Sequence, residues 1–290
     1  MTQSHQSFAC LVAVDPETAR ITHASETCGT ILGHDASDML DANMRDLLGV
    51  ELWHALRNAA SNPAFGKSAI AVQALGERGE SLNILAYPTG PLHVIEVLPK
   101  NPQEFGSTAP IDIAKASMAQ LLPLKAGAEF ASHLSTLLRH FTGSEHVLIW
   151  DRQAGDAAIC TAESKRASRD SMLGAQSQWP ALWPDDCGTI GLISDVQADP
   201  VSLLTASDPL VSEIDLTKAL SSNPSPDLTA RLQQLSMRSS ILLRLARNGT
   251  PWAVVECQSS RARVPSSALL SLFDVMQPFL DAKLQLLHGA

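Results

Sequence analysis

The feature that most constrains the fold of this sequence is a pair of strand patterns joined by Asn248-Gly249. Hydrophobic side chains alternate along residues 239–246, and a second hydrophobic segment follows at residues 252–257. An Asn-Gly pair between two such segments is the strongest short-range signal for a β-hairpin. The chain is therefore expected to fold around an antiparallel sheet, with its helices packed against that sheet.

The first hundred residues also predict strands that are separated by turns and short helices. A buried strand over residues 8–15, a turn at residues 15–18 and a second strand over residues 21–24 form a hairpin. Further signals predict helical pieces at 25–32 and 44–48 and strands at 68–74, 81–86 and 93–98. Strands on both sides of short helices are typical of an antiparallel α+β domain.

Changes in composition divide the chain into two expected domains. The first spans residues 1–105, a linker with one short helix covers residues 106–125, and the second domain spans residues 126–290. A helix is expected from residue 126 to Gly143, and a strand at 147–150. The second domain contains a long insertion at about 165–235, weakly periodic over 165–210 and rich in Ser, Pro and Asp there, which predicts a long loop region.

A last helix is expected over residues 266–287, with Pro278 introducing a kink. Its apolar stripe is wider than one core face requires. The residues of this stripe that we single out are Leu269, Leu272, Phe273, Met276, Phe279 and Leu280. Ordinary packing on the sheet accounts for the stripe as well as a dimer seam does, and the sequence leaves both open. We expect a homodimer through residues 268–287.

Charge and composition exclude several classes of protein. A net charge of −9 argues against a nucleic-acid binder, which needs basic surface to neutralise phosphates. No apolar run approaches the length needed to cross a bilayer and no signal peptide is visible, so a cytoplasmic location without membrane association is expected. The five cysteines lie far apart, as expected of free thiols in a reducing compartment; their positions are 10, 28, 160, 187 and 257.

Short segments in a fixed order carry a resemblance to a known family. They are residues 11–16 (Leu-Val-Ala-Val-Asp-Pro), 20–25 (Arg-Ile-Thr-His-Ala-Ser), 92–97 (Leu-His-Val-Ile-Glu-Val), 192–196 (Leu-Ile-Ser-Asp-Val), 225–226 (Ser-Pro) and 252–257 (Trp-Ala-Val-Val-Glu-Cys). Together they resemble the PAS–GAF half of bacterial phytochromes. The resemblance implies an α+β fold in which a PAS domain precedes a GAF domain, each an antiparallel sheet flanked by helices.

The sequence departs from that family where a linear tetrapyrrole, the bilin, is attached. Bacterial members bind it through a cysteine that precedes the PAS core, and here about seven residues without cysteine precede the first expected strand. Plant and cyanobacterial members use a GAF cysteine, whose position matches Asp227. The resemblance therefore implies that neither attachment route exists. It also implies that the N-terminus is too short to thread through the GAF insertion, so we expect no knot.

The positions that match noncovalent bilin contacts have changed as well. Leu228 stands at the pocket histidine, Gly191 and Ser222 at two propionate-binding arginines, Gln258 at a second histidine, Arg231 at a tyrosine, and the segment around Trp183 lacks the family's aspartate. Two propionates buried without cations would be costly. Arg231 is open to three interpretations: a solvated helix residue, a partner of Asp227 one turn earlier, or a cation for a small anion.

The sequence thus predicts a phytochrome-like sensory module that binds no bilin and no other cofactor and works independently of light. It would act by dimerising and by relaying conformational change through its last helix to a downstream signalling domain or partner. No enzyme activity is expected, since no histidine-kinase or cyclic-di-GMP output lies in these residues. Two alternatives remain open: a red/far-red photoreceptor that binds biliverdin noncovalently, and a GAF/PAS sensor of another small ligand or of redox state.

Overall fold

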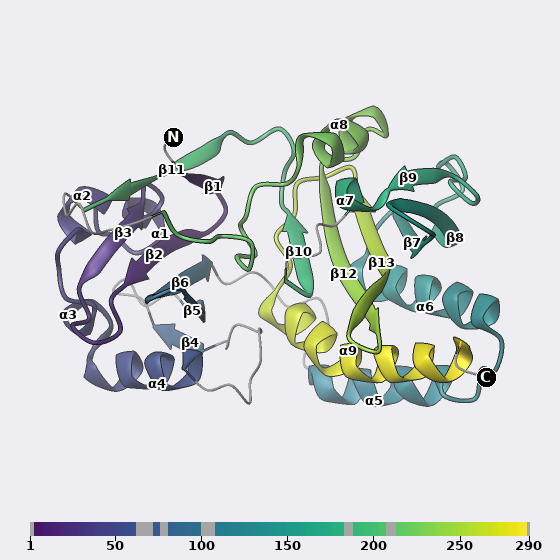
Figure 1. Ribbon diagram of the computed structural model, residues 1–290, viewed down its shortest axis with the longest axis horizontal. Coiled ribbons are helices and arrows are strands. Elements are labelled where there is room, and N and C mark those ends of the chain that lie inside the picture. Colours follow the sequence, from purple (N-terminus) through teal and green to yellow (C-terminus); the bar gives the residue numbers. More distant parts are fainter. Residues whose placement is uncertain are drawn as a thin grey trace. The chain divides into compact units, whose positions relative to one another are not determined.

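The chain forms two compact α+β units, each built on an antiparallel sheet (Figure 1). The computed structural model describes residues 3–61, 72–75, 81–99, 108–182, 188–206 and 213–288. The first unit comprises Met1–Lys100 with Ala198–Asn223, and the second comprises Asn101–Gln197 with Pro224–Ala290. The α+β fold class is confirmed. Residues 198–223 lie within the predicted insertion but belong to the first unit.

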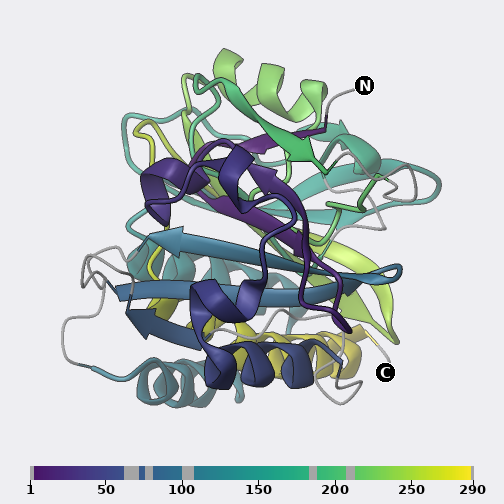
Figure 2. The ribbon, with the colours of Figure 1, turned by 90° about the vertical axis from the view of Figure 1, so that its left-hand side faces the viewer.

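The first unit contains a seven-stranded sheet, whose strands run across the view of Figure 2. In spatial order its strands are β1 (Ser4–Gln6), β11 (Pro200–Thr205), β3 (Ile21–Ser25), β2 (Cys10–Val14), β6 (Leu92–Pro99), β5 (Ser81–Thr89) and β4 (Val72–Leu75). The predicted hairpin of the first two expected strands is confirmed by the antiparallel pairing of β2 with β3. The expected strand at 68–74 corresponds to β4, although most of that range lies outside the described residues.

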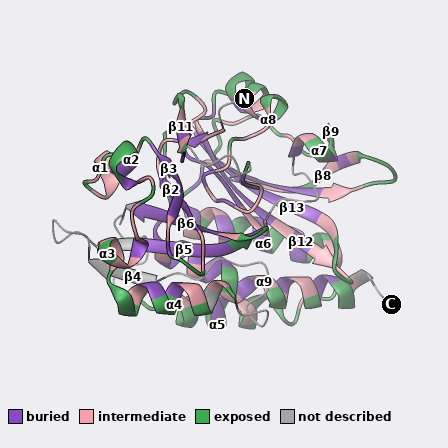
Figure 3. Ribbon diagram, turned by 60° about the vertical axis from the view of Figure 1, so that its left-hand side comes forward, coloured by how far each residue is buried: buried purple, intermediate pink, exposed green. Residues whose placement is uncertain are grey.

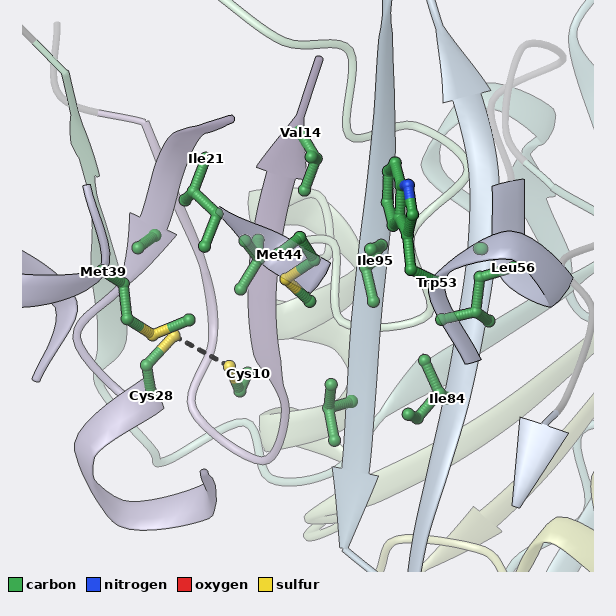
Figure 4. Close-up of a cluster of buried hydrophobic side chains, with 14 of the residues drawn as sticks. Cys10, Val14, Ile21, Cys28, Met39, Met44, Trp53, Leu56, Ile84 and Ile95 are labelled. Atoms are coloured by element: carbon green, nitrogen blue, oxygen red, sulfur yellow. Dashed lines mark hydrogen bonds between the residues drawn. The ribbon is translucent and has the colours of Figure 1, made fainter. Parts of the chain in front are cut away.

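Four helices cover one face of this sheet: α1 (Cys28–Ile31), α2 (Ala36–Met39), α3 (Met44–Leu48) and α4 (Val50–Ala60). Met39, Met44 and Trp53 from these helices pack on this face of the sheet, where Figure 4 shows Trp53 beside Ile95 of β6. The opposite face is also covered, because Leu11 and Ala13 of β2 contact a second cluster that includes Ile214. Burial on both faces explains why β2 is an unbroken apolar run in the sequence.

Residues 198–223 hold the N-terminal residues of the first unit from two sides. Strand β1 pairs with β11, and the Gln6 amide nitrogen donates to the Ser221 carbonyl oxygen at 2.7 Å. The Glu96 carboxylate of β6 accepts from the backbone nitrogens of Leu220 and Ser221 at 2.9 and 2.6 Å. The absence of a knot stays a prediction, and the residues before the first expected strand form β1, which pairs with β11 of the insertion.

The second unit contains a six-stranded sheet. In spatial order its strands are β10 (Ile190–Ile193), β12 (Ser239–Arg247), β13 (Thr250–Ser259), β7 (His146–Arg152), β8 (Ala157–Lys165) and β9 (Gln176–Gln178). The hairpin predicted at Asn248-Gly249 joins β12 to β13, and both turn residues have positive φ, 52° and 76°. Positive φ at both central positions is what Asn-Gly supplies in a two-residue turn.

Helices cover both faces of this second sheet (Figure 1). On one side, called the α6 face, lie α6 (Gly127–Thr142) and α9 (Ser267–His288), with α5 (Pro110–Leu121) packed on α9. On the other, called the α8 face, lie α7 (Trp179–Leu182) and α8 (Pro226–Gln234). The expected linker at 106–125 is therefore part of the second unit, since its helix α5 contributes to the packing.

The weakly periodic region at 165–210 is not the long loop that we expected. It contains β9, α7 and β10 of the second unit and β11 of the first. These elements are only three to six residues long, so each presents too few turns or alternations for a hydrophobic period to emerge. They are held in place instead by pairing with distant strands, such as that of β10 with β12.

The last helix is confirmed as α9, but the residues that we singled out for a dimer seam are buried within their own unit. Leu269, Leu272, Phe273, Met276 and Leu280 are at most 1 % exposed, and Phe279 is half-buried. Figure 3 shows buried and exposed residues along the length of α9. Ordinary packing therefore accounts for most of the stripe. Among the described residues, no helix combines the length and apolarity needed to span a bilayer.

Candidate functional site

The α8 face of the second sheet carries most of the positions at which the sequence predicted a lost bilin site. Side chains alternate between the two faces of a strand, so Leu148 and Trp150 of β7 and Val254 of β13 lie on this face. Helix α7 adds Trp179 and Leu182 to the same cluster. The result is a closely packed aliphatic and aromatic core under the two helices.

Helix α8 brings Leu228 into that core. Its N-cap is Ser225, whose hydroxyl oxygen accepts from the Leu228 amide nitrogen at 3.2 Å, and Pro226 occupies the first turn. Leu228 and Leu232 lie one turn apart on the inner side of the helix, at 4 % and 0 % exposure. The position that matches the family's pocket histidine is thus filled by a leucine in full apolar contact.

Arg231 follows on the same helix and enters a buried polar group. Its Nη2 donates to Glu256 Oε1 at 2.7 Å, and the Trp150 indole nitrogen donates to Glu256 Oε2 at 2.9 Å. The guanidinium lies 5.3 Å from the centre of the Trp150 ring, a cation–π arrangement. Glu256 is completely buried and the Arg231 side chain is 18 % exposed. The interpretation of Arg231 as a solvated residue is therefore wrong.

The predicted alternative pairing of Arg231 with Asp227 is not the one observed. Asp227 is exposed in the first turn of α8, where its charge favours the helix N-terminus. Glu256 takes the arginine instead, because a completely buried carboxylate needs a cation far more than an exposed one does.

Further along the α8 face, polar groups are buried without partners among the described residues. They are Gln258 Nε2 and Oε1, Ser240 Oγ and Arg231 Nη1. Gln258 and Ser240 lie opposite each other on β13 and β12. Buried polar atoms are usually hydrogen-bonded, so these donors and acceptors are available to bind a small polar group.

The structure places the remaining predicted positions as follows. Gly191 is buried in β10 opposite Leu242, on the α8 face but without a side chain. Ser222 belongs to the first unit, where its carbonyl oxygen accepts from the Gln6 side chain at 2.7 Å. Trp183 lies outside the described residues. The α8 face therefore gathers Gly191, Leu228, Arg231 and Gln258, but not Ser222.

One functional feature of this face was missed by sequence reasoning. Glu256 was visible as a lone carboxylate inside the apolar segment 252–257, and such a residue needs a buried partner. Cys160 of β8 lies in the same cluster, and burial raises the pKa of its thiol to about 12. A thiol held protonated at neutral pH is a poor nucleophile, so Cys160 does not offer a substitute attachment site.

The opposite side of the sheet, the α6 face, has a cavity of about 230 Å³. Its lining is mostly apolar and includes Phe130, Leu134, Ile149, Leu245 and Trp252. One carboxylate, Asp151, also lines it, and burial raises the pKa of this group to about 6. The described residues show no group of three or more potential metal ligands.

The comparisons with known proteins agree with this architecture. Residues 1–100 match the family of the PAS fold. The chromophore-binding domain of Stigmatella aurantiaca bacteriophytochrome, in a variant crystallised in the Pr state, matches with a TM-score of 0.85 and 16 % identity over 97 % of this chain and 95 % of that one. The chromophore-binding domain of an unusual bacteriophytochrome from R. palustris matches with a TM-score of 0.84 and 16 % identity, over 99 % and 96 %. No curated protein matches the chain.

The chain therefore has the PAS–GAF fold of bacteriophytochrome chromophore-binding domains, with the first unit as PAS and the second as GAF domain. The resemblance seen in the sequence is confirmed at the level of the fold. On the α8 face, Arg231 is paired with the buried Glu256, and Gly191 and Leu228 carry no polar side-chain atom.

Proposed function

We propose that this chain is a phytochrome-like sensory module that signals without a bilin. The observation that carries the proposal is the α8 face, where Leu228 is packed among tryptophans and leucines and Arg231 is paired to Glu256. Binding a tetrapyrrole there would require moving a closely packed cluster apart and exposing a buried carboxylate. Both changes are costly, so the native packing competes directly with the pigment.

A spectroscopic titration tests this proposal. Purified protein is mixed with biliverdin, and absorbance is recorded in the red region before and after red and far-red illumination. A bacteriophytochrome chromophore-binding domain serves as the positive control. We expect the broad spectrum of free biliverdin and no photoconversion. A structured red band that converts under light would show a noncovalent photoreceptor and would overturn the proposal.

Substitutions on the α8 face provide the matched control. Leu228→His restores the family's residue type at one position, yet leaves Arg231 paired and Gly191 without a side chain. If the loss of the site is distributed over several positions, this variant should still give no red band. Recovery of a photoconverting spectrum by the single change would mean that the rest of the pocket is intact, contrary to the proposal.

The output that we propose is a dimer that passes conformational change along α9, without catalysis in these residues. The apolar side chains available for a second copy lie on the outer sides of α5 and α9: Ile111 is 44 %, Leu122 60 % and Leu286 71 % exposed. Helices α5 and α9 pack together, and the Lys283 ammonium donates to the Leu122 carbonyl oxygen at 2.8 Å. These residues replace the buried ones as candidates for the seam.

Light scattering tests the dimer. The unmodified chain at micromolar concentration should have the mass of two copies, and Leu122→Glu with Leu286→Glu should reduce it to one. Leu173→Glu, at an equally exposed leucine outside these helices, is the control and should leave the dimer intact. A monomer already in the unmodified protein would remove dimerisation from the proposed function.

The cavity on the α6 face favours a second candidate function, binding of a small ligand by the GAF domain. Its volume of about 230 Å³ is below the ~300–1,000 Å³ of sites for drug-sized molecules, so the ligand would be small. An apolar lining with one carboxylate suits a small aromatic or aliphatic amine. Benzylamine should raise the melting temperature of the chain but not that of Asp151→Asn; an equal effect on both would reject the site.

A further inference from the structure

Two cysteines that the sequence places eighteen residues apart meet in the core of the PAS domain. The Sγ atoms of Cys10, in β2, and Cys28, at the start of α1, are 2.8 Å apart, as the dashed line in Figure 4 shows. Atoms that are not bonded approach to about 3.5–4 Å, and the sulfurs of a disulfide lie at about 2.05 Å. The pair is thus closer than ordinary packing, and a small movement would bring the sulfurs to bonding distance.

The two thiols differ in their ease of ionisation. A hydrogen bond from Cys10 lowers the pKa of Cys28, and the Ser25 hydroxyl, 3.8 Å from Cys28 Sγ, acts in the same direction. Burial raises the pKa of Cys10 well above its usual range. Cys28 therefore ionises more readily than Cys10. This is the asymmetry that a nucleophilic cysteine and its resolving partner require.

The other described cysteines lack this arrangement. Cys160 and Cys257 are buried in the second unit, and burial raises the pKa of each thiol to about 12. Both are free cysteines, and the Cys160 thiol donates to the Ala162 carbonyl oxygen at 3.5 Å. They are matched internal controls, because they are equally buried but isolated.

We propose that Cys10 and Cys28 are a redox site of the PAS domain, which a hydroperoxide oxidises to an intramolecular disulfide. The Cys28 thiolate attacks one oxygen of hydrogen peroxide; an S–O bond forms, the O–O bond breaks, and hydroxide leaves, taking up the proton that Cys28 lost on ionising to become water. Cys10 then attacks the sulfur of the resulting sulfenic acid; the S–S bond forms, the S–O bond breaks, and the proton of Cys10 leaves with hydroxide as water. The two thiols lose two electrons, and peroxide is reduced to two waters.

Both side chains are fully buried, so access depends on local opening. Helix α1 has only four residues, and short helices without extensive packing open more readily than core strands do. Peroxide is little larger than water and needs only a brief opening. Once formed, the disulfide would join β2 to α1 and stop that opening, which gives the oxidation state a structural effect within the PAS domain.

The test uses the full chain in its unmodified form. The protein is treated with hydrogen peroxide, free thiols are blocked by alkylation without reductant, and peptides are mapped by mass spectrometry. We expect a Cys10–Cys28 linked peptide that has lost two hydrogen atoms, with Cys160 and Cys257 still alkylated. We expect its formation to be at least about tenfold faster than oxidation at either control cysteine. Unlinked Cys10 and Cys28 after the controls have oxidised would reject the proposal.

Two substitutions separate the roles of the thiols. In Cys10→Ser the reaction should stop at sulfenic acid on Cys28, which dimedone labels; in Cys28→Ser, Cys10 should stay reduced. If dimedone labelled Cys10 in Cys28→Ser faster than it labelled Cys28 in Cys10→Ser, Cys28 would not be the attacking thiol, contrary to the proposal. Because the linked peptide is measured in the unmodified protein, the proposal can be rejected even if a variant fails to fold.

Discussion

The two faces of the GAF sheet differ in how they use the same strands. On the α8 face, Leu228, Trp150 and Trp179 fill the space beneath the helices, and Arg231 is paired with a buried carboxylate. On the α6 face, a cavity of about 230 Å³ is left beside Asp151. The resemblance places the bilin contacts on the α8 face, where the described side chains pack together, whereas the α6 face has a cavity. One sheet can therefore carry two different kinds of candidate site on its two faces.

The largest expected effect comes from breaking the buried pair on the α8 face. Glu256→Ala leaves Arg231 without its counter-charge and Trp150 without its acceptor, so it should lower the free energy of unfolding by about 3–5 kcal/mol. Urea unfolding followed by circular dichroism measures the change. The control is Asp195→Ala, which breaks the more exposed pair with Arg238 and should cost about 1 kcal/mol or less. If both variants lost the same free energy of unfolding, burial of the Glu256 pair would not be what makes it important.

Truncation of the leucine at the pocket-histidine position should come next. Leu228→Ala removes side-chain contacts in a closed core and should cost about 2–4 kcal/mol in the same urea experiment. Leu173→Ala changes a leucine that is 60 % exposed and should stay within about 0.5 kcal/mol of the unmodified protein. A similarly small loss at Leu228 would indicate an open α8 face.

On the α6 face, substitution of Asp151 is expected to raise the free energy of unfolding by an amount that depends on pH. Burial raises the pKa of Asp151 from 3.8 to about 6, so the folded state binds a proton more readily than the unfolded state. Stability from this group is present below about pH 4 and is lost as pH rises through about 6. Asp151→Asn removes that loss and should stabilise the protein by about 2–3 kcal/mol at pH 8, with no gain below pH 4.

The matched control for this pH profile is Asp156→Asn, which changes an exposed aspartate close to Asp151 in the sequence. It should leave the pH dependence of the urea midpoint unchanged. A gain for Asp151→Asn that is the same at pH 4 and pH 8 would contradict the assignment of the effect to a buried carboxylate.

The smallest effects compare added volume on the two faces. Ala158→Val adds two methyl groups to the packed α8 face and should cost about 1–3 kcal/mol, whereas Ala253→Val lines the cavity and should change stability by less than about 1 kcal/mol. Thermal unfolding of the two variants measures the difference. A larger loss for Ala253→Val would reverse the comparison between the faces.

The sequence predicted the elements that carry strong local patterns. The Asn248-Gly249 hairpin, the β2–β3 hairpin and α9 are all present, because turn chemistry and hydrophobic period determine them locally. Helix α4 was missed, and the region at 165–210 was taken for a loop, because its short strands are ordered only by distant partners. Non-local pairing of this kind leaves no period in a short segment.

The candidate site was predicted in part. The positions of Leu228, Gly191 and Gln258 on one face followed from the resemblance, but the role of Arg231 did not, since its partner Glu256 lies 25 residues later on another strand. Ser222 was assigned to the same site, yet its segment packs in the PAS domain. The Cys10–Cys28 pair was equally invisible, because only the packing of α1 on β2 brings the thiols together.

The most direct test of the closed α8 face follows the indole N–H of Trp150 by NMR of protein with ¹⁵N-labelled tryptophan. The chain has five tryptophans, and Trp→Phe substitutions assign their signals. Because this N–H is bonded to the buried Glu256, we expect it to exchange slowly with D₂O, more slowly than that of half-buried Trp252, and to be unchanged by biliverdin. Rapid exchange of Trp150, or a saturable shift of its signal by biliverdin, would contradict a closed face.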